Sequence, residues 1–263
     1  MTKKVRNLNQ VIDTIKEKLI EIEKRENIKI LHCVESGSRA WGFASQDSDY
    51  DVRFLYYHRP EWYFSVSKQA DNIVKMEEHN LLDFAGWELK KTLLLLIKGN
   101  MSLYEWIHSP IFYKQSKEFE MLKALAQEFY NPKALMFSYV GLAENDYKAY
   151  ADREKPKLKK YLYILRTLAA CHWIEQRQTP PPIEMDKLKE VFSQESLIWD
   201  FLNNLIEDKK KGTELGVIDS PTHINRWIEK QIVYYKQQSD SMPTLQKNTQ
   251  PLSDFFYQTV MGK

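Results

Sequence analysis

Two glycines and two aspartates stand close together in residues 34–54, VESGSRAWGFASQDSDYDVRF. Glycines such as Gly37 and Gly42 are typical of positions where the backbone takes a positive φ or where another group approaches closely. Asp49 and Asp51 are separated by one residue in a run that favours a β-strand, so we expect both carboxylates on one face of that strand. Two carboxylates so close repel each other unless a cation holds them. The spacing therefore predicts a cation site.

The Gly37-Ser38 pair indicates what that cation would carry. An apolar run ends at Val34, so the pair is expected to form the turn that follows a strand. Backbone N–H groups exposed in such a turn, together with a serine hydroxyl, form a cradle for phosphate oxygens. The ten residues between Ser38 and Asp49 leave room for a short helical turn and a loop. Mg²⁺ or Mn²⁺, held by carboxylates and by phosphate oxygens of a substrate, is the expected ion.

The composition of the 263 residues excludes several classes of protein. With 43% hydrophobic and 28% charged residues the chain is expected to be globular. Lys+Arg 38 and Asp+Glu 36 leave a net charge of +2, so affinity for a polyanion would need a local basic patch. We find no apolar run long enough for a membrane span and no apolar stretch of a secretory signal. Two cysteines make no disulfide framework, and we expect a cytoplasmic protein.

The elements that must position these residues mix helical and strand periods. Apolar residues recur at helical spacing over 9–26 and predict an amphipathic helix. A strand is expected over 28–34, and a second one runs through 49–54, where apolar and charged residues alternate. The next expected elements are a hairpin with strands at 73–76 and 81–84, and a helix at about 86–98.

From about residue 116 onward only helical periodicity remains. Prolines divide it into helices that we expect at 116–130, 133–151, 157–177, 186–211 and 221–237. The predicted fold class is α+β, with a small mixed β-sheet domain and its flanking helices followed by an all-helical domain. We place the first domain at 1–115, the helical domain at 116–238, and a polar, flexible tail at 239–263.

The order of a strand, Gly37-Ser38, ten residues and Asp49-Tyr50-Asp51 resembles the signature of the polymerase-β-type nucleotidyltransferase superfamily. The strings GSRAWGFASQDSDYDVRF and LLDFAGWELKKTLLLLIKGNMSLYEWIHSP are similar to one branch of it. That branch comprises stand-alone bacterial predicted nucleotidyltransferases, partly associated with RNA-repair ligases. The resemblance is dense over about 31–110, continues through 159–183, and is not visible over 204–263.

This resemblance implies transfer of a nucleotidyl group from a nucleoside triphosphate to an acceptor hydroxyl. Two Mg²⁺ ions would be held by Asp49, Asp51 and a third carboxylate, which falls on Asp83. One ion would activate the attacking hydroxyl, and the other would neutralise the departing pyrophosphate. The triphosphate itself would be held in the turn, by Gly37, Ser38 and Arg39.

Three further basic residues are candidates for contact with the phosphates. Arg53 follows Asp51 by two residues, so the two share a strand face, and Arg53 could offset developing charge. Lys159 and Arg166 are seven residues apart and share a helix face. The resemblance implies that a basic residue of the second domain closes over the phosphates. The alternatives are an ion pair with Asp49 or Asp51 for Arg53, and a solvated basic stripe for the helix.

Two site candidates have other readings. Asp83 could cap a helix that begins near Gly86 instead of binding a metal ion. Glu35 could be a further ligand, although a solvated carboxylate at the strand edge is the simpler expectation.

Two further patterns are better explained by chance. The pairs His32-Cys33 and Cys171-His172 suggest zinc, but neighbouring strand residues point to opposite faces and cannot easily both bind one ion. Arg166 and His172 match the permissive Arg-x₄₋₆-His pattern of helical HEPN-type ribonucleases.

Motif and resemblance together predict a metal-dependent nucleotidyltransferase. Its acceptor stays open between an RNA end, a protein side chain and a small hydroxylated molecule, with RNA favoured by family association alone. The rival prediction is a non-catalytic nucleotide-binding regulatory or toxin-neutralising module, against which the three intact carboxylates argue. Most tryptophans of the first domain are expected in the core, although one could stack on a base; they are Trp41, Trp62, Trp87 and Trp106. The sequence indicates no oligomeric state.

Overall fold

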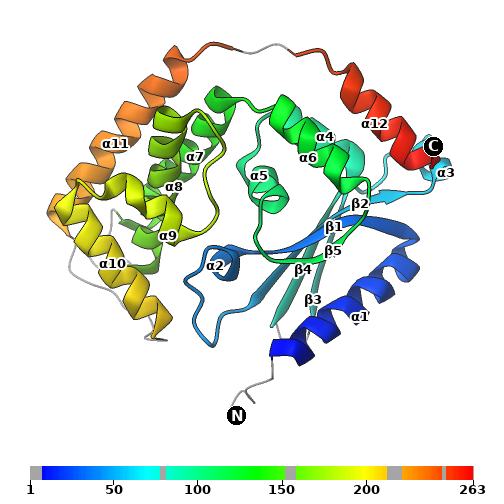
Figure 1. Cartoon of the computed structure of the whole chain (residues 1–263), viewed down its shortest axis with the longest axis horizontal. Coiled ribbons are helices and arrows are strands. Elements are labelled where there is room, and N and C mark those ends of the chain that lie inside the picture. Colours follow the sequence, from blue (N-terminus) through cyan, green and yellow to red (C-terminus); the bar gives the residue numbers. More distant parts are fainter. Residues whose placement is uncertain (1–7, 78–80, 152–157, 212–220, 245–246, 263) are drawn as a thin grey trace.

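Residues 28–115 contribute a five-stranded mixed sheet, which lies in the right half of Figure 1. The structure is a computed structural model that describes residues 8–77, 81–151, 158–211, 221–244 and 247–262. The sheet has the order β3-β4-β2-β1-β5, with β2 and β4 parallel and the other neighbours antiparallel. Its strands are β1 (Ile28–Ser36), β2 (Tyr50–His58), β3 (Asn72–Glu77), β4 (Leu82–Glu88) and β5 (Phe112–Gln115).

One face of the sheet is covered by α1 (Leu8–Glu26), which lies where the helical periodicity predicts it. Its apolar side chains pack with alternate residues of β2, among them Val52 and Phe54, in a small core. The intervening residues of β2 and β4 point to the opposite face, because successive strand residues alternate. That opposite face carries the charged residues of β2 and is called here the catalytic face.

The larger core lies on the catalytic face and extends into the helices that follow the sheet. It joins residues on both sides of the division expected at 115 and 116, for example Leu55 with Leu165. The main helices are α4 (Leu89–Ile97), α5 (Met101–Ile107), α6 (Phe119–Glu128), α7 (Pro132–Asp146), α8 (Leu158–Arg177), α10 (Ser196–Lys210) and α11 (Thr222–Ser241). The short ones are α2 (Gly37–Ala40), α3 (Pro60–Tyr63), α9 (Met185–Leu188), a π-helical turn (Tyr147–Ala151) and a 3₁₀ turn (Lys189–Phe192).

The last residues are not the flexible tail that the sequence predicts. They contain a helix, α12 (Gln250–Met261), whose Leu252 and Phe255 are buried. This helix packs against α4 and α6, and the ring of Phe256 contacts Tyr63 at 5.0 Å between centroids. The prediction of a flexible tail was wrong because it relied on the polar average composition of 239–263. Three apolar residues in this segment recur at helical spacing and make contacts.

The helix predicted at 86–98 begins three residues later, at Leu89. Gly86 belongs to β4, where a Cβ atom would lie 2.2 Å from the ring of Phe54. The strand therefore needs glycine at this position for packing rather than for a turn. Glu88 caps α4, since its carboxylate accepts from the N–H groups of Lys90 and Lys91. This capping arrangement excludes Asp83 as the helix cap.

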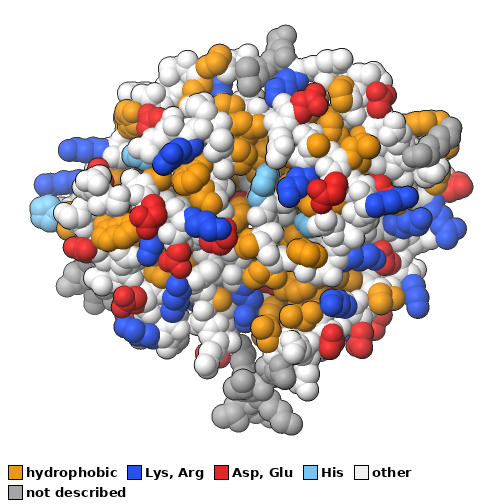
Figure 2. Space-filling model, in the orientation of Figure 1, with side chains coloured by type: hydrophobic (Ala, Val, Ile, Leu, Met, Phe, Trp, Pro, Cys, Tyr) orange, Lys and Arg blue, Asp and Glu red, His pale blue; other side chains and the backbone are white. Residues whose placement is uncertain are grey.

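Other boundaries differ in smaller ways. The helix predicted at 186–211 is divided into α9, a 3₁₀ turn and α10. The turn of the predicted hairpin at 77–80 lies largely outside the described residues. No described helix combines the length and apolar character that a membrane span requires. On the face drawn in Figure 2 basic and acidic side chains are interspersed, in keeping with the small net charge.

Candidate active site

The carboxylates of Asp51 and Asp83 meet on the catalytic face of the sheet. Because β2 and β4 are parallel neighbours, Asp51 is paired with Asp83 in the strand register. Both side chains are partly exposed, at 33% and 27%. The two residues are distant in sequence, and it is the parallel pairing of β2 with β4 that brings their carboxylates together.

Arg53 lies between these two carboxylates. Its Nη2 atom donates to Oδ1 of Asp51 at 2.7 Å and to Oδ2 of Asp83 at 2.8 Å. Its Nη1 atom donates to the backbone carbonyl of Asp83 at 2.8 Å. The structure therefore shows the ion pair that the sequence left as an alternative for Arg53. The guanidinium is held by residues of β2 and β4.

The environment of Asp51 favours its protonated form. Burial is the largest influence and raises the pKa of the Asp51 carboxyl, the Arg53 guanidinium lowers it, and the neighbouring carboxylates of Asp83 and Asp49 raise it again. A raised pKa of this origin shows that burial and the neighbouring carboxylates outweigh the single charge of Arg53. A bound cation would lower the pKa of Asp51 again.

The two carboxylates fit a divalent metal ion. Since both oxygens contact the same nitrogen of Arg53, they face one point in space. Mg²⁺ is typically held by one or two carboxylates together with substrate phosphates. Among the described residues no three His, Cys, Asp or Glu side chains gather closely enough to hold a metal ion. The predicted trio is thus only partly assembled: Asp49 is exposed just before β2, although its charge still raises the pKa of Asp51.

The Gly37 turn lies directly against Asp51. Gly37 has a φ of +61°, and a Cβ atom placed on it would be 2.1 Å from Oδ2 of Asp51. Ser38 is half-buried in the same turn, and within the described part of the chain its hydroxyl has no hydrogen-bond partner. The turn and the carboxylate therefore border the same space, as the phosphate-cradle prediction requires.

Arg39 contacts the loop that leads into β2. Its guanidinium donates to the backbone carbonyls of Ser48, at 2.6 Å, and of Asp49, at 3.1 Å. It also lies over the ring of Tyr50, 3.7 Å from the centroid. These contacts hold the loop and position Asp49, and the contact of Arg39 with the triphosphate stays a prediction.

Glu35 is buried, contrary to the expectation of a solvated strand edge. Only 1% of the residue is exposed. Oε1 accepts from the backbone N–H of Asp51 at 2.9 Å, and Oε2 accepts a short hydrogen bond from the hydroxyl of Tyr113. Burial raises the pKa of Glu35 to about 7, against these hydrogen bonds, which lower it. Glu35 fixes the backbone of Asp51 from the opposite face of the sheet. The burial of Glu35 could have been predicted from the sequence, because the strand period places Glu35 on the same buried face as Cys33.

Arg166 is not available to a triphosphate, which corrects the prediction. It is 3% exposed, its Nη1 atom donates to Glu105 at 2.8 Å, and its guanidinium lies 4.0 Å from the ring centroid of Trp41. Glu105 also accepts from Nε1 of Trp41 and from the hydroxyl of Tyr139. The cluster joins the turn region to α5, α7 and α8, so Arg166 has a structural role.

Lys159 and Tyr163 of α8 are less enclosed than Arg166. Lys159 is exposed and forms no ion pair with the described residues. Tyr163 packs edge-on against Trp41, with 5.7 Å between ring centroids. Burial raises the pKa of the Tyr163 hydroxyl, and the charge of Asp51 raises it further, so the two groups lie within electrostatic range. Sequence periodicity alone gave no reason to select Tyr163.

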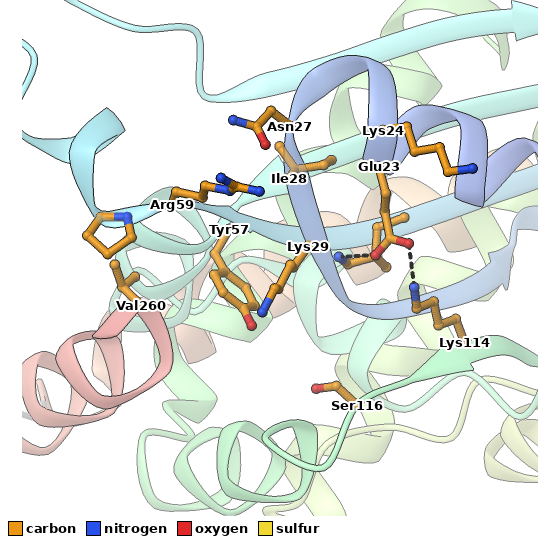
Figure 3. Close-up of a pocket in the computed structure, with 12 residues that line it drawn as sticks. Glu23, Lys24, Asn27, Ile28, Lys29, Tyr57, Arg59, Lys114, Ser116 and Val260 are labelled. Atoms are coloured by element: carbon orange, nitrogen blue, oxygen red, sulfur yellow. Dashed lines mark hydrogen bonds and ion pairs between the residues drawn. The ribbon is translucent and has the colours of Figure 1, made fainter. Parts of the chain in front are cut away.

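A separate groove of about 850 Å³ lies at the other end of the sheet, where β1 begins and β2 ends (Figure 3). Exposed Lys29 and Arg59 line it, and Lys114 pairs with Glu23 at 2.7 Å. Six strand residues, or about 20 Å, separate Ile30 in this groove from Ser36 beside the carboxylates. The basic residues in the last turn of α1 stabilise the exposed carbonyls of that helix end. This groove is therefore not the predicted site.

The chance patterns do not form sites. Cys33 lies in the small core and Cys171 in the large one, so the two candidate zinc pairs are not together. His172 contacts the hydroxyl of Tyr235 at 2.9 Å, whereas Arg166 pairs with Glu105. Of the four tryptophans only Trp106 is fully buried, stacked on Trp87 at 3.8 Å between centroids.

The chain is similar to known proteins. The protein YcgL of Bacillus subtilis (strain 168) is 41% identical over 224 residues, which cover 85% of this chain and 84% of that protein. A nucleotidyltransferase-like protein of Exiguobacterium sibiricum 255-15 has a crystal structure that covers 98% of this chain and 81% of its own. It is 13% identical with a TM-score of 0.33, so no geometry is transferred from it. The model of the RNA repair pathway DNA polymerase beta family, RlaP, matches residues 11–258. The predicted superfamily is thereby confirmed, and the chain belongs to the RNA repair pathway DNA polymerase beta family.

Proposed function

We propose that the protein is a metal-dependent nucleotidyltransferase that joins a nucleotidyl group from a nucleoside triphosphate to a hydroxyl at an RNA end. The observation that carries the proposal is the register of β2 and β4, which sets Asp51 opposite Asp83 beside the Gly37 turn. Family membership supports the reaction class, and the RNA-repair description supports RNA as the acceptor to test first.

Each residue of the site has a distinct task in this proposal. Asp51 and Asp83 hold the metal ion, and Glu35 holds the backbone N–H of Asp51 so that its carboxylate keeps its place. The Ser38 hydroxyl donates a hydrogen bond to a phosphate oxygen of the triphosphate. When bound, Mg²⁺ or Mn²⁺ activates the acceptor hydroxyl and neutralises charge on the leaving pyrophosphate. Asp49 completes the ligand set by turning inward from its exposed position.

The position of Arg53 between the two carboxylates favours the rival function, a regulatory module. Its guanidinium already neutralises Asp51 and Asp83, as it would in a regulatory module that binds nucleotide without turnover. In the enzyme, the metal ion and Arg53 must share the two carboxylates or the guanidinium must withdraw. The two functions therefore differ in whether bound triphosphate is turned over when a divalent ion is present.

The test is to incubate the protein with each labelled nucleoside triphosphate, Mg²⁺ or Mn²⁺, and a set of RNAs with free terminal hydroxyls. A cell extract freed of RNA supplies protein and small-molecule acceptors in parallel. We expect label on RNA and release of pyrophosphate, both absent with Asp51→Asn. Label found only on proteins or on small molecules would show that one of these, and not RNA, is the acceptor. Triphosphate binding without pyrophosphate release under any condition would favour the regulatory module.

A further inference from the structure

The part of the catalytic face beyond Asp83 is open and apolar. Strand β3 is the edge strand on that side, and its register sets Met76 opposite Asp83 and Val74 opposite Ala85. Residues directly opposite each other in a sheet point to the same face. Met76 and Val74 therefore stand on the catalytic face, where they are 55% and 64% exposed.

Together with Ala85 and Trp87 these residues form a shelf next to the carboxylates. Ala85 is half-buried and small, so no large side chain rises between Asp83 and Trp87 on β4. Trp87 stacks on Trp106 and closes the far end. The shelf, defined as Val74, Met76, Ala85 and Trp87, begins one strand spacing, about 4.8 Å, from Asp83.

The order of groups across the sheet separates a donor side from an acceptor side. The Gly37 turn follows β1 and borders Asp51 on β2, and Asp83 on β4 comes next, followed by Met76 on β3. In phosphoryl transfer the attacking and leaving oxygens lie roughly in line, on opposite sides of the phosphorus. If the pyrophosphate leaves toward the Gly37 turn, the acceptor hydroxyl must arrive from the side of Asp83 and the shelf.

We propose that the shelf binds the terminal nucleoside of an RNA acceptor, with its base against Val74 and Met76 and its hydroxyl beside Asp83. The inference rests on the proposed function, whose acceptor it specifies. A base presents an uncharged, flat ring, which suits an apolar surface, and thioether sulfur makes favourable contacts with aromatic rings. The cation of β3 is turned away, because Lys75 pairs with Glu26 of α1 at 2.6 Å.

The competing occupants are a polypeptide strand added to the edge of β3 and a second copy of this chain. Either would use the backbone of the edge strand as well as its side chains. The terminal nucleoside is favoured by continuity with the site, because the shelf adjoins a carboxylate that must hold the acceptor's ion. Of the three occupants, only a terminal nucleoside with its hydroxyl one strand away from Met76 would contact both the shelf and Asp83.

The first experiment locates the RNA directly and needs no turnover. A short single-stranded RNA ending in a thiouridine is irradiated on the protein with Mn²⁺, and the cross-linked peptide is identified by mass spectrometry. We expect the cross-link in the β3 peptide around Val74 and Met76, and its loss in the double variant Val74→Thr, Met76→Thr. A cross-link elsewhere, unchanged by these substitutions, would overturn the proposal.

The second experiment separates acceptor binding from donor binding. The double variant should raise the KM for RNA roughly tenfold, as expected for loss of the apolar contact with one base, and leave the KM for the triphosphate unchanged. Val66→Thr is the matched control, since Val66 is fully exposed in the loop before β3 and away from the carboxylates. An unchanged KM for RNA in the double variant would remove the shelf from acceptor binding.

Failure of this inference and failure of the proposed function give different results. A cross-link on the shelf without turnover of any RNA would support the shelf and count against the function. Turnover of RNA that the double variant does not affect would support the function and overturn the shelf. A wild-type dimer that the double variant separates into monomers in sedimentation would assign the surface to a second copy, against the proposal.

Discussion

The Cβ atom that Gly37 lacks would lie 2.1 Å from Oδ2 of Asp51. The turn and the carboxylate are therefore in contact, and no other residue fits at position 37 without moving Asp51. The positive φ of Gly37 adds a second requirement for glycine. These two requirements can be separated, because Gly42 has a φ of +83° and nothing within 4 Å of its missing Cβ.

Gly37→Ala and Gly42→Ala should consequently differ. Gly42→Ala carries only the cost of a left-handed backbone for a non-glycine residue, about 1–2 kcal/mol in the free energy of unfolding. Gly37→Ala carries this cost and also displaces Asp51, so it should destabilise the protein more and abolish the response of triphosphate binding to Mg²⁺. Denaturant unfolding and calorimetry measure the two effects. Equal behaviour of the two variants would show that the contact with Asp51 has no consequence.

Arg53 and a divalent ion compete for the same two carboxylates. Arg53→Met removes the cation between Asp51 and Asp83, so we expect a lower melting temperature without metal and a larger rise with Mn²⁺ than in the wild type. Thermal unfolding over a MnCl₂ titration measures this difference. Arg59→Met is the control, because Arg59 is exposed and has no ion pair with any residue that the structure describes. Identical metal responses of wild type and Arg53→Met would show that no ion binds this pair.

Asp83 should matter to turnover more than to binding. A carboxylate that holds the ion of the attacking hydroxyl acts mainly in the transition state. Asp83→Asn should leave triphosphate affinity within a few-fold and lower the rate of pyrophosphate release by three orders of magnitude or more, about 4 kcal/mol of barrier. Calorimetry and a pyrophosphate assay with an RNA acceptor test the two statements. Equal rates in wild type and variant would remove Asp83 from the mechanism.

The sequence predicted the parts of this site that depend on local spacing. The alternation around Asp51 placed β2 and its faces correctly, and the Gly37-Ser38 pair does form the turn after β1. The meeting of Asp51 with Asp83 depends on strand order, which spacing does not encode, so it came from the resemblance alone. Period 2 identified the face of Asp83 without indicating what that face would meet.

The sequence did not reveal the contacts of side chains with long reach or hidden burial. Arg39 and Arg166 were selected by position, but a flexible guanidinium bonds to whichever acceptors the fold places within reach. For Arg39 these are two loop carbonyls, and for Arg166 the buried Glu105. Glu35 looked solvated because charged residues usually are, and two partners make its burial tolerable, the hydroxyl of Tyr113 on β5 and the backbone N–H of Asp51. None of these partners can be identified from the periodicity of the sequence.

The role assigned to Arg166 can be tested by stability. Arg166→Met leaves Glu105 buried without its cation, which should cost about 3–5 kcal/mol in the free energy of unfolding. Lys159→Met, on the same helix but exposed, should change it by less than about 0.5 kcal/mol. The double variant Arg166→Met, Glu105→Leu should recover part of the loss. A stable Arg166→Met protein that no longer binds triphosphate would restore Arg166 to the phosphate site.

Glu35 should make stability fall as pH rises. Burial holds its pKa at about 7 in the folded protein, above the ordinary value of 4.5, so between these values the native state binds more protons than the unfolded state. The free energy of unfolding must then decrease with pH across this window, by on the order of 3 kcal/mol at most, and the loss persists above it. Glu35→Gln keeps an oxygen acceptor for the N–H of Asp51 but does not titrate, so its stability should decline less.

Urea unfolding of metal-free wild type and Glu35→Gln, at several pH values from about 4.5 to 7.5, measures the two slopes. Glu61→Gln, an exposed change on α3, controls for loss of a glutamate as such. Asp51, whose pKa is also raised, titrates in all three proteins, and because its charge raises the pKa of Glu35, part of the difference between wild type and Glu35→Gln comes from this coupling. As the pH rises toward neutral, the free energy of unfolding of wild type should therefore fall steadily relative to that of Glu35→Gln. Parallel curves for these two proteins would mean that Glu35 is ionised throughout, and that the hydroxyl of Tyr113 and the N–H of Asp51 fully compensate its burial.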